Sequence, residues 1–153
     1  MSASVGIGYD SHRFVRGGRL VLGGVDIEHE SGLAGHSDGD VLIHAIIDAL
    51  LGAAGMGDIG GLFPDDEDRW RDADSLDLLR TVLGRVSGRV LNVDATLICE
   101  QPRIAPHRAE MERLLSEALS ARVNVKATTN EGMGWIGRGE GITCIAVAAL
   151  ESE

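Results

Sequence analysis

The stretch His36-Ser-Asp-Gly-Asp40-Val-Leu-Ile-His44-Ala-Ile-Ile-Asp48-Ala-Leu-Leu-Gly52 decides how the chain is expected to fold. Ser37 is a favourable helix N-cap, and after it comes an apolar stripe at helical spacing, made of Val41, Ile43, Ile46, Ile47, Leu50 and Leu51. Steps of four residues place Asp40, His44 and Asp48 on one face of the predicted helix. A histidine between two carboxylates indicates a binding site, but a solvated polar stripe explains the same pattern equally well.

The length and composition of the chain predict one globular domain spanning residues 1–153. The chain has 153 residues, which is enough to bury one core and too few for two comfortable domains. Apolar residues make up 44% and aromatic residues 3%, so the core must be aliphatic. A formal net charge of −10 argues against nucleic acid and against anionic membrane surfaces as partners.

A cytoplasmic protein is predicted, because the sequence shows no membrane span or secretion signal and its cysteines fit buried free thiols. No apolar run has the length of a membrane span, and the first residues lack the basic and apolar regions of a secretion signal. Cys99 and Cys144 lie in apolar, strand-like runs. They are therefore expected to be buried free thiols and not a disulfide.

Hydrophobic periodicity predicts the order β-β-α-α-β-α-β-β. Strands are expected at residues 5–12, 20–22, 89–99, 123–128 and 142–150, and helices at 37–52, 75–88 and 106–121, with Ser75 as the cap of the second helix. Glycines from Gly52 onward are expected to end the first helix. This order favours an α/β (α+β) domain with one mixed sheet and helices on one face.

Alternation along the first strand puts Asp10 and His12 side by side, on the face opposite Val5, Ile7 and Tyr9. With His44 they make a set of two imidazoles and one carboxylate, which zinc accepts with a fourth position open. Non-haem iron uses a similar triad, so the ligand types alone leave the metal undecided. An Asp-x-His pair also occurs by chance.

A second polar cluster follows the predicted strand at 123–128. The hydroxyls of Thr128 and Thr129 suit phosphate oxygens, and Glu131 suits a magnesium ion shared with phosphates. An ordinary strand end rich in threonine explains the same residues equally well. Arg138 and Glu140 fit a structural ion pair, and neither a P-loop nor a Rossmann glycine motif occurs.

Motifs spread over the whole chain, in order, resemble the family of 2-C-methyl-D-erythritol 2,4-cyclodiphosphate synthases of the non-mevalonate isoprenoid pathway. They are Asp10-x-His12, Leu22-Gly-Gly, His36-Ser-Asp-Gly-Asp40-x3-His44-Ala, Gly52-Ala-Ala-Gly, Gly57-Asp-Ile-Gly60, Phe63-Pro-Asp65, Asn92-Val-Asp94, Val123-Asn-Val-Lys-Ala-Thr-Thr129, Glu131 and Gly137-Arg-Gly-Glu-Gly141. Each motif is weak by itself, and together they are highly specific.

The resemblance implies a homotrimer whose sheets pack about a threefold axis, with active sites between neighbouring subunits. The implied reaction converts 4-diphosphocytidyl-2-C-methyl-D-erythritol 2-phosphate to the cyclic diphosphate and CMP, as a phosphorus–oxygen lyase. The 2-phosphate oxygen attacks the β-phosphorus within one molecule, so positioning and charge neutralisation are the main tasks of the catalyst. No protein nucleophile is needed.

The resemblance also assigns roles to individual residues. Asp10, His12 and His44 would hold zinc or another divalent transition metal, and Glu131 would contact magnesium or manganese on the α- and β-phosphates. The catalytic residues would be His36 and Thr129, which polarise the phosphates, with Ser37 beside His36. The remaining substrate contacts would be Asp58, Ile59, Gly60, Phe63 and Asp65 around methylerythritol, and Cys99, Pro102, Arg103, Ile104, Ala105 and Thr128 around cytidine.

Departures from the family pattern are confined to a few positions. Asn130 stands for a common threonine and Arg103 for a common lysine, Ala105 is smaller than usual, and Trp135 replaces a phenylalanine and would narrow a pocket. Arg138 and Glu140 would lie toward the trimer axis, where family members can carry an isoprenoid diphosphate. If the cytosine is read by backbone groups, the changes in the cytidine segment are expected to be tolerated.

Two other functions remain open at this point. A metal-dependent phosphohydrolase could use the same triad, but it would need a metal-bound water free to attack. A non-catalytic, metal-stabilised trimer could bind a diphosphate lipid. Within the opening helix, the resemblance leaves His44 as the only zinc ligand, makes Asp40 part of the helix start, and makes Asp48 an orienting group or a solvated acid.

Overall fold

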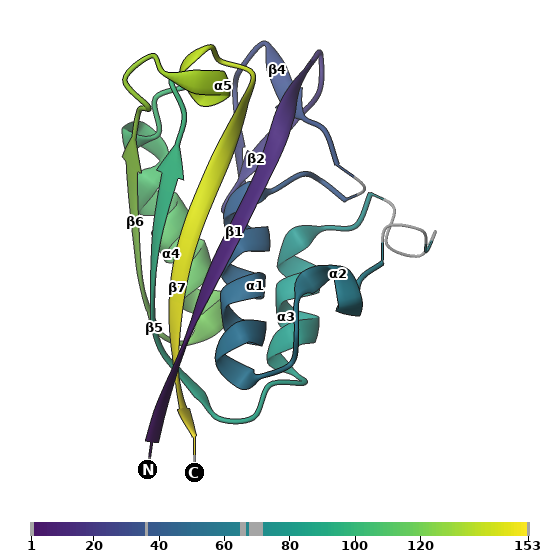
Figure 1. Cartoon of the computed structure of the whole chain (residues 1–153), viewed down its shortest axis with the longest axis vertical. Helices are drawn as coiled ribbons and strands as arrows, with labels where there is room; N and C mark the ends of the chain where they lie inside the picture. The colour runs from purple at the N-terminus through teal and green to yellow at the C-terminus, as the bar shows by residue number, and fades with distance from the viewer. Residues whose placement is uncertain (1, 36, 65–66, 68–71, 153) are drawn as a thin grey trace.

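A twisted five-stranded sheet runs along the molecule (Figure 1). The computed structural model describes residues 2–35, 37–64, 67 and 72–152. The strand order is β4-β1-β7-β5-β6, and β5 and β6 are parallel while the other pairs are antiparallel. The strands are β1 (Ser2–Arg16), β4 (Ser31–Leu33), β5 (Arg89–Ile98), β6 (Arg122–Thr128) and β7 (Gly141–Ser152). The predicted mixed sheet is therefore confirmed, and β2 (Leu20–Leu22) and β3 (Val25–Ile27) form a separate hairpin.

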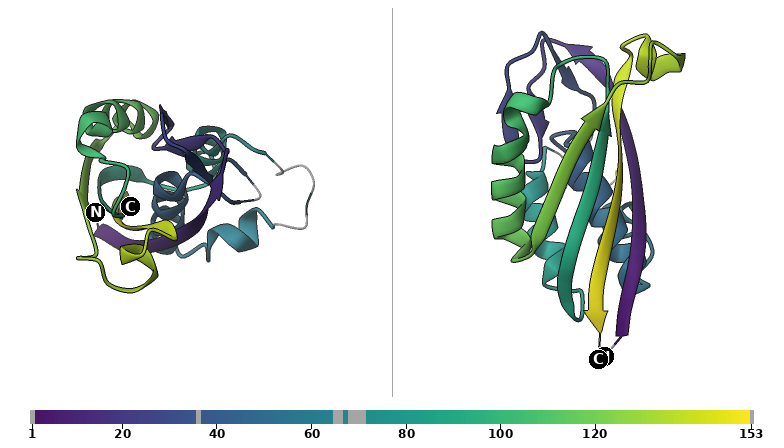
Figure 2. Two further views of the ribbon diagram at one scale, coloured as in Figure 1. Left: turned by 90° about the horizontal axis from the view of Figure 1, so that it is seen from above. Right: turned by 90° about the vertical axis from the view of Figure 1, so that its left-hand side faces the viewer.

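The longer helices cover one face of the sheet, as predicted (Figure 2). They are α1 (Val41–Ala54), α3 (Ser75–Leu83) and α4 (Arg108–Leu119). Short helical turns connect other elements: α2 (Ile59–Leu62), η2 (Ala105–His107) and α5 (Gly134–Gly137). The core lies between α1 and the sheet, and it is aliphatic, with Leu42, Ile46 and Leu50 fully buried.

Helix α1 packs directly against β1 because two glycines leave room for its backbone. A Cβ atom on Gly6 would lie 2.0 Å from the carbonyl oxygen of Ala49, and one on Gly8 would lie 1.9 Å from that of Ala45. Real Cβ atoms do not approach other atoms so closely, so a side chain at either position would push the helix away from the strand. The close contact brings the start of α1 next to the second half of β1.

The other face of the sheet is open and apolar. Val5, Ile7 and Tyr9 of β1 are 57–70% exposed, and Ile145 and Val147 of the neighbouring β7 are 38% and 39% exposed. The side-chain alternation predicted for β1 is confirmed, since these residues face away from α1. An apolar patch formed by adjacent strands is typical of a surface that is covered by another molecule.

The helix ends differ from the sequence predictions. The N-cap of α1 is Asp40 and not Ser37, because the Asp40 carboxylate accepts from Ile43 N at 3.0 Å and also from the amides of Gly23 and Gly24. The N-cap of α3 is Asp74 and not Ser75. Gly52 lies inside α1, which ends at Ala54 with Gly55 as its C-cap, where φ is 69°.

Two further predictions can be compared with the structure. Cys99 and Cys144 are buried free thiols, as predicted. Within the part of the chain that the structure describes, no helix is both long enough and apolar enough to cross a membrane.

Candidate functional site

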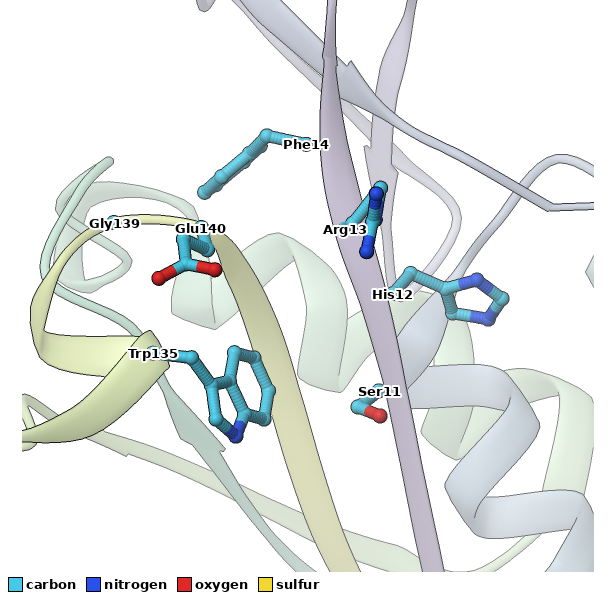
Figure 3. A pocket seen from close by; sticks show the side chains of 7 residues that line it. All are labelled: Ser11, His12, Arg13, Phe14, Trp135, Gly139 and Glu140. Atoms are coloured by element: carbon cyan, nitrogen blue, oxygen red, sulfur yellow. The ribbon is translucent and has the colours of Figure 1, made fainter.

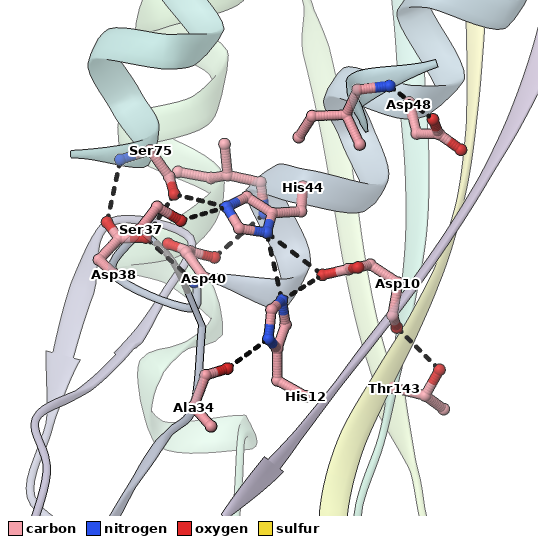
Figure 4. Close-up of polar contacts among 12 residues, drawn as sticks. Asp10, His12, Ala34, Ser37, Asp38, Asp40, His44, Asp48, Ser75 and Thr143 are labelled. Carbon is pink, nitrogen blue, oxygen red and sulfur yellow. Dashed lines mark hydrogen bonds and ion pairs between the residues drawn. The ribbon is translucent and has the colours of Figure 1, made fainter. Parts of the chain in front are cut away.

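Asp10, His12 and His44 come together between β1 and the first turn of α1 (Figure 4). His12 Nε2 lies 2.8 Å from Asp10 Oδ2, and His44 Nδ1 lies 3.3 Å from both of these atoms. The β1 alternation turns Asp10 and His12 toward the helix, and the close packing of α1 on β1 brings His44 to them. The structure thus brings together the three side chains that the sequence predicted as metal ligands.

The contacts of these atoms fit a bound cation. Asp10 Oδ2 is buried, and no described residue gives it a hydrogen bond of good geometry, although His12 Nε2 is close. A buried carboxylate oxygen without a donor is costly, and two nitrogen atoms and one oxygen atom facing one point can ligate a metal instead. The set of two imidazoles and one carboxylate suits zinc and other divalent transition metals.

The electrostatics of the triad keep Asp10 ionised. Burial alone would raise the pKa of Asp10, but the neighbouring His12 and His44 offset burial, so that this pKa lies below its ordinary value. Burial alone would lower the pKa of His12, but the Asp10 carboxylate offsets it and the pKa of His12 is raised. The carboxylate is therefore ready to ligate, while a metal ion would compete with a proton for His12.

In each histidine, the ring nitrogen that does not face Asp10 has a hydrogen-bond partner of its own. His12 Nδ1 bonds the carbonyl oxygen of Ala34. His44 Nε2 lies 2.9 Å from Ser37 Oγ and 3.0 Å from Ser75 Oγ. Figure 4 shows the two serines on one side of the His44 ring, with Asp10 and His12 on the other. These bonds fix both rings in orientations that point His12 Nε2 and His44 Nδ1 at Asp10.

A cavity of about 510 Å³ opens next to the triad. Several residues predicted to contact the substrate line it together with the triad, namely Ser37, Ile59, Gly60 and Phe63. Ala34, Gly35, Arg13 and Leu78 also line it, and sequence reasoning did not single them out. The cavity is large enough for part of a phosphorylated sugar-like ligand.

Two predicted carboxylates hold the short helix α2 beside this cavity. Asp58 caps α2 and accepts from Gly61 N at 2.8 Å, so one of its oxygens is already used by the backbone. Asp48 of α1 accepts from Ile59 N at 3.2 Å. Asp48 is therefore not a simply solvated acid, and no described contact joins it to His44. Its hydrogen bond from Ile59 N fixes α2 against α1. His36 and Asp65, also predicted in this region, lie outside the described residues.

The second predicted cluster lies beyond the end of β6. Thr129 Oγ1 accepts from Glu131 N at 3.2 Å, and Glu131 is exposed with φ of 54°. Glu100 holds this loop, because its carboxylate accepts from Asn130 N at 2.7 Å and from Gly132 N at 3.1 Å. Sequence reasoning gave Glu100 no role of its own, although it lies inside the predicted cytidine segment 99–105.

The predicted cytidine segment is next to this loop. The amide of Cys99 donates to Thr128 O at 3.1 Å, and Cys99 Sγ donates to Pro102 O at 3.6 Å. Ile104 is buried, whereas Arg103 and Ala105 are exposed at the start of η2. The structure thus brings Thr128, Thr129, Glu131 and the segment 99–105 into one region.

The two regions are separate within one chain. Asp10 and His12 of the triad are on β1, and the Thr128–Glu131 region begins at the end of β6. β7 and β5 lie between these two strands. Three strand spacings amount to about 14 Å. Among the described residues, none of the second region lines the cavity next to the triad. Both regions are at the same end of the sheet, since Ile98 of β5 pairs with both Thr143 and Thr128.

Arg138 and Glu140 form an exposed ion pair, with 2.7 Å between Arg138 Nε and Glu140 Oε2. Beside them is a cavity of about 550 Å³, which Trp135, Glu140, Ser11 and Phe14 help to line (Figure 3). In Figure 3 the ring of His12 points away from Trp135, on the other side of β1. Ser11, His12 and Arg13 line both this cavity and the one next to the triad, so the two cavities are neighbours along β1.

Comparisons with known proteins agree on one family. The model of the YgbB family matches residues 3–151. The chain is 53% identical over 153 residues to a 2-C-methyl-D-erythritol 2,4-cyclodiphosphate synthase of Syntrophomonas wolfei, covering 96% of this chain and 98% of that protein. It is 55% identical to part of a bifunctional enzyme IspD/IspF of Anaeromyxobacter, covering 96% of this chain and 39% of that protein.

Solved structures show the same similarity. A CDP-bound 2C-methyl-D-erythritol-2,4-cyclodiphosphate synthase superposes with a TM-score of 0.86 at 36% identity, covering 96% of this chain and 99% of that one. The bifunctional IspDF of Campylobacter jejuni gives a TM-score of 0.94 at 38% identity, and the match covers 99% of this chain and 43% of that one.

Proposed function

This chain belongs to the YgbB family, and we propose that it acts as its relatives are named, as a 2-C-methyl-D-erythritol 2,4-cyclodiphosphate synthase of the non-mevalonate isoprenoid pathway. It would convert 4-diphosphocytidyl-2-C-methyl-D-erythritol 2-phosphate to the cyclic diphosphate and release CMP, and its class would be that of a phosphorus–oxygen lyase. Besides the family, the convergence of Asp10, His12 and His44 supports this proposal, as does the lack of a well-aligned hydrogen bond from any described residue to Asp10 Oδ2.

The reaction closes a ring within one molecule. An oxygen of the 2-phosphate forms a bond to the β-phosphorus while the bond from that phosphorus to the CMP oxygen breaks. Well-oriented intramolecular reactions reach effective molarities of about 10⁵–10⁸ M, so most of the work is to hold a flexible, highly charged substrate in a folded conformation. The substrate itself supplies the nucleophile.

The triad would hold a divalent cation, with zinc the metal that we expect. Such an ion, when bound, supplies positive charge beside a phosphate oxygen. Asp10 and His12 are placed by β1 and His44 by α1, and the backbones of these two elements are in direct contact at Gly8 and Ala45. Phe63 and Ile59 help to line the cavity, and their apolar side chains would limit the access of water to the reacting phosphates, which would favour cyclisation over hydrolysis.

The region after β6 would bind the diphosphate and the cytidine. Glu131, presented by the loop that Glu100 holds, would contact magnesium or manganese on the α- and β-phosphates. The Thr129 hydroxyl would polarise a phosphate oxygen, as we also propose for His36. Cytosine would be read by backbone groups of residues 99–105, so the exposed side chains of Arg103 and Ala105 would have little effect.

A complete active site would need two subunits. Asp10 and His12 are on β1, Glu131 is in the loop after β6, and two strands lie between β1 and β6. A second copy of the chain would therefore bring its Glu131 region to the triad of the first. The open apolar face at Ile7 and Val147 supports packing of the sheets in a homotrimer. Arg138 and Glu140 would then lie near its axis, where an isoprenoid diphosphate could bind. We propose a cytoplasmic location.

The test is incubation of the purified protein with the diphosphocytidyl substrate, zinc and magnesium, with the products separated by chromatography and identified by ³¹P NMR. We expect CMP and the cyclic diphosphate in equal amounts. A linear hydrolysed product would instead indicate a metal-dependent phosphohydrolase. No turnover, with a diphosphate lipid still bound, would indicate a non-catalytic binding trimer.

A further inference from the structure

We propose that Ser75 and Asp38 are positioning residues that set the tautomer of the metal ligand His44. Neither residue touches the cavity next to the triad, and sequence reasoning gave Ser75 only the role of a helix cap. The proposal rests on the metal site of the proposed function. It concerns which nitrogen atom of His44 carries the hydrogen in the neutral ring.

A continuous chain of hydrogen bonds connects His44 with Asp38 (Figure 4). His44 Nε2 lies 3.0 Å from Ser75 Oγ, and Ser75 Oγ donates a short hydrogen bond to Asp38 Oδ1. The other carboxylate oxygen, Asp38 Oδ2, accepts from Ser75 N at 2.9 Å. Ser75 is fully buried, so water does not compete for its hydroxyl group.

The direction of these bonds follows from the number of hydrogens available. A serine hydroxyl has one hydrogen, and an ionised carboxylate can only accept. Because Ser75 gives its hydrogen to Asp38, its oxygen can only accept from His44. His44 Nε2 must therefore carry the hydrogen, and in a neutral ring this leaves the lone pair on Nδ1. Nδ1 is the atom that lies 3.3 Å from Asp10 Oδ2.

Ser37 alone would not settle the tautomer. Its hydroxyl lies 2.9 Å from His44 Nε2, and no further acceptor for its hydrogen is described, so it could either donate or accept. Of the two described partners of His44 Nε2, Ser75 has already given its hydrogen to Asp38, and this favours the tautomer with the hydrogen on Nε2. Loss of the Ser75–Asp38 bond would allow a serine to donate to Nε2 and would turn an N–H group toward the metal position.

Asp38 is itself held in place by the backbone around it. Its Oδ1 accepts from Asp40 N at 3.1 Å, and its own amide donates to Ala73 O at 3.2 Å. Asp38 thus connects the loop before α1 with the start of α3. The outer partners of metal-bound histidines commonly affect metal affinity by about 10–100-fold, although they do not touch the metal.

The experiment compares zinc affinity and histidine tautomers in four proteins: wild type, Ser75→Ala, Asp38→Asn and the control Asp74→Asn. Asp74 is next to Ser75 and is the N-cap of α3. Asparagine is an equally good N-cap residue, and Asp74 has no described contact with His44. Zinc affinity is measured by competition with a chromophoric chelator. The tautomer is read from ¹⁵N NMR of the metal-free proteins, whose folding is checked by circular dichroism.

We expect His44 of the wild type to carry its hydrogen on Nε2, and Ser75→Ala and Asp38→Asn to bind zinc about 10–100-fold more weakly, with Asp74→Asn unchanged. A wild-type hydrogen on Nδ1, or folded Ser75→Ala and Asp38→Asn proteins with unchanged affinity, would overturn the positioning role and leave the proposed reaction intact. If one variant does not fold, the other decides. A wild type that binds no divalent transition metal would overturn both proposals.

Discussion

Gly8 of β1 and Ala45 of α1 are in backbone contact, so that a Cβ atom on Gly8 would lie 1.9 Å from the carbonyl oxygen of Ala45. The two residues flank the metal ligands: Asp10 is two positions after Gly8, and His44 is the residue before Ala45. The distance between strand and helix therefore sets the distance between the carboxylate and the imidazole. Packing and metal binding depend on the same contact.

Replacement of this glycine should affect stability and metal binding together. In Gly8→Ala the new methyl group meets backbone atoms, which cannot rotate away, so we expect a loss of at least about 1–3 kcal/mol in the free energy of unfolding and weaker zinc binding. Urea denaturation and chelator competition measure the two effects. Gly84→Ala is the control, since its Cβ would lie 3.5 Å from the nearest atom at φ of −69°. Equal stability of the two variants would contradict the argument.

Removal of the helix ligand should abolish the metal site. His44→Ala leaves two ligands, so we expect loss of zinc and of nearly all activity. Zinc at about 100 times its dissociation constant should raise the Tm of the wild type by about 5–10 °C and leave that of His44→Ala unchanged. His107→Ala, in η2, should respond to zinc as the wild type does. Normal zinc content in His44→Ala would refute the assignment of the triad.

A change at Glu131 should alter the response of the enzyme to magnesium and leave its binding of zinc unchanged. Glu131→Gln keeps the size of the side chain but removes its charge, so we expect unchanged zinc affinity and a several-fold higher magnesium concentration for half-maximal activity. A magnesium titration of the initial rate measures this. Glu110→Gln, on the exposed side of α4, is the matched control. An unchanged magnesium dependence in Glu131→Gln would remove Glu131 from its proposed role.

A charge on the open face of the sheet should disrupt subunit assembly. Ile7 is 70% exposed in the single chain, and its burial between subunits would make Ile7→Glu costly. We expect light scattering to show a trimer for the wild type and smaller species for this variant. Met56→Glu, at an exposed apolar residue after α1, should remain trimeric. A wild type that is monomeric at all concentrations would contradict the proposed shared site.

The sequence allowed the main elements and the triad to be predicted, because their signals are periodic. Alternation in β1 put Asp10 and His12 on one face. The four-residue steps of α1 offered Asp40, His44 and Asp48 alike, and the family resemblance then kept His44 as the ligand. Caps were less predictable. Both Ser37 and Asp40 are suitable caps, and Asp40 takes the position because Gly23 and Gly24, distant in sequence, donate to its carboxylate. Local sequence does not contain that contact.

Short elements and contacts between residues distant in sequence could not be predicted either, because neither leaves a periodic signal in the sequence. β4, α2 and α5 span three or four residues, which is too few for a period to be visible. Ser75 looked like a cap because it comes just before an apolar repeat, and only the fold places its hydroxyl on His44. The separation of Glu131 from the triad likewise depends on the strand order, which hydrophobic periodicity does not determine.

The pairing of Ser2 with Ser152 has a consequence for how the protein can be joined to others. Ser2 and Ser152 lie at the far end of β1 and β7 from Asp10 and Cys144 (Figure 1). A domain joined there would extend away from the metal site that we propose. The bifunctional relatives carry such an addition within one polypeptide. The same adjacency makes the chain suitable for circular permutation: a short linker could join the old termini, and new ones could be opened in an exposed loop.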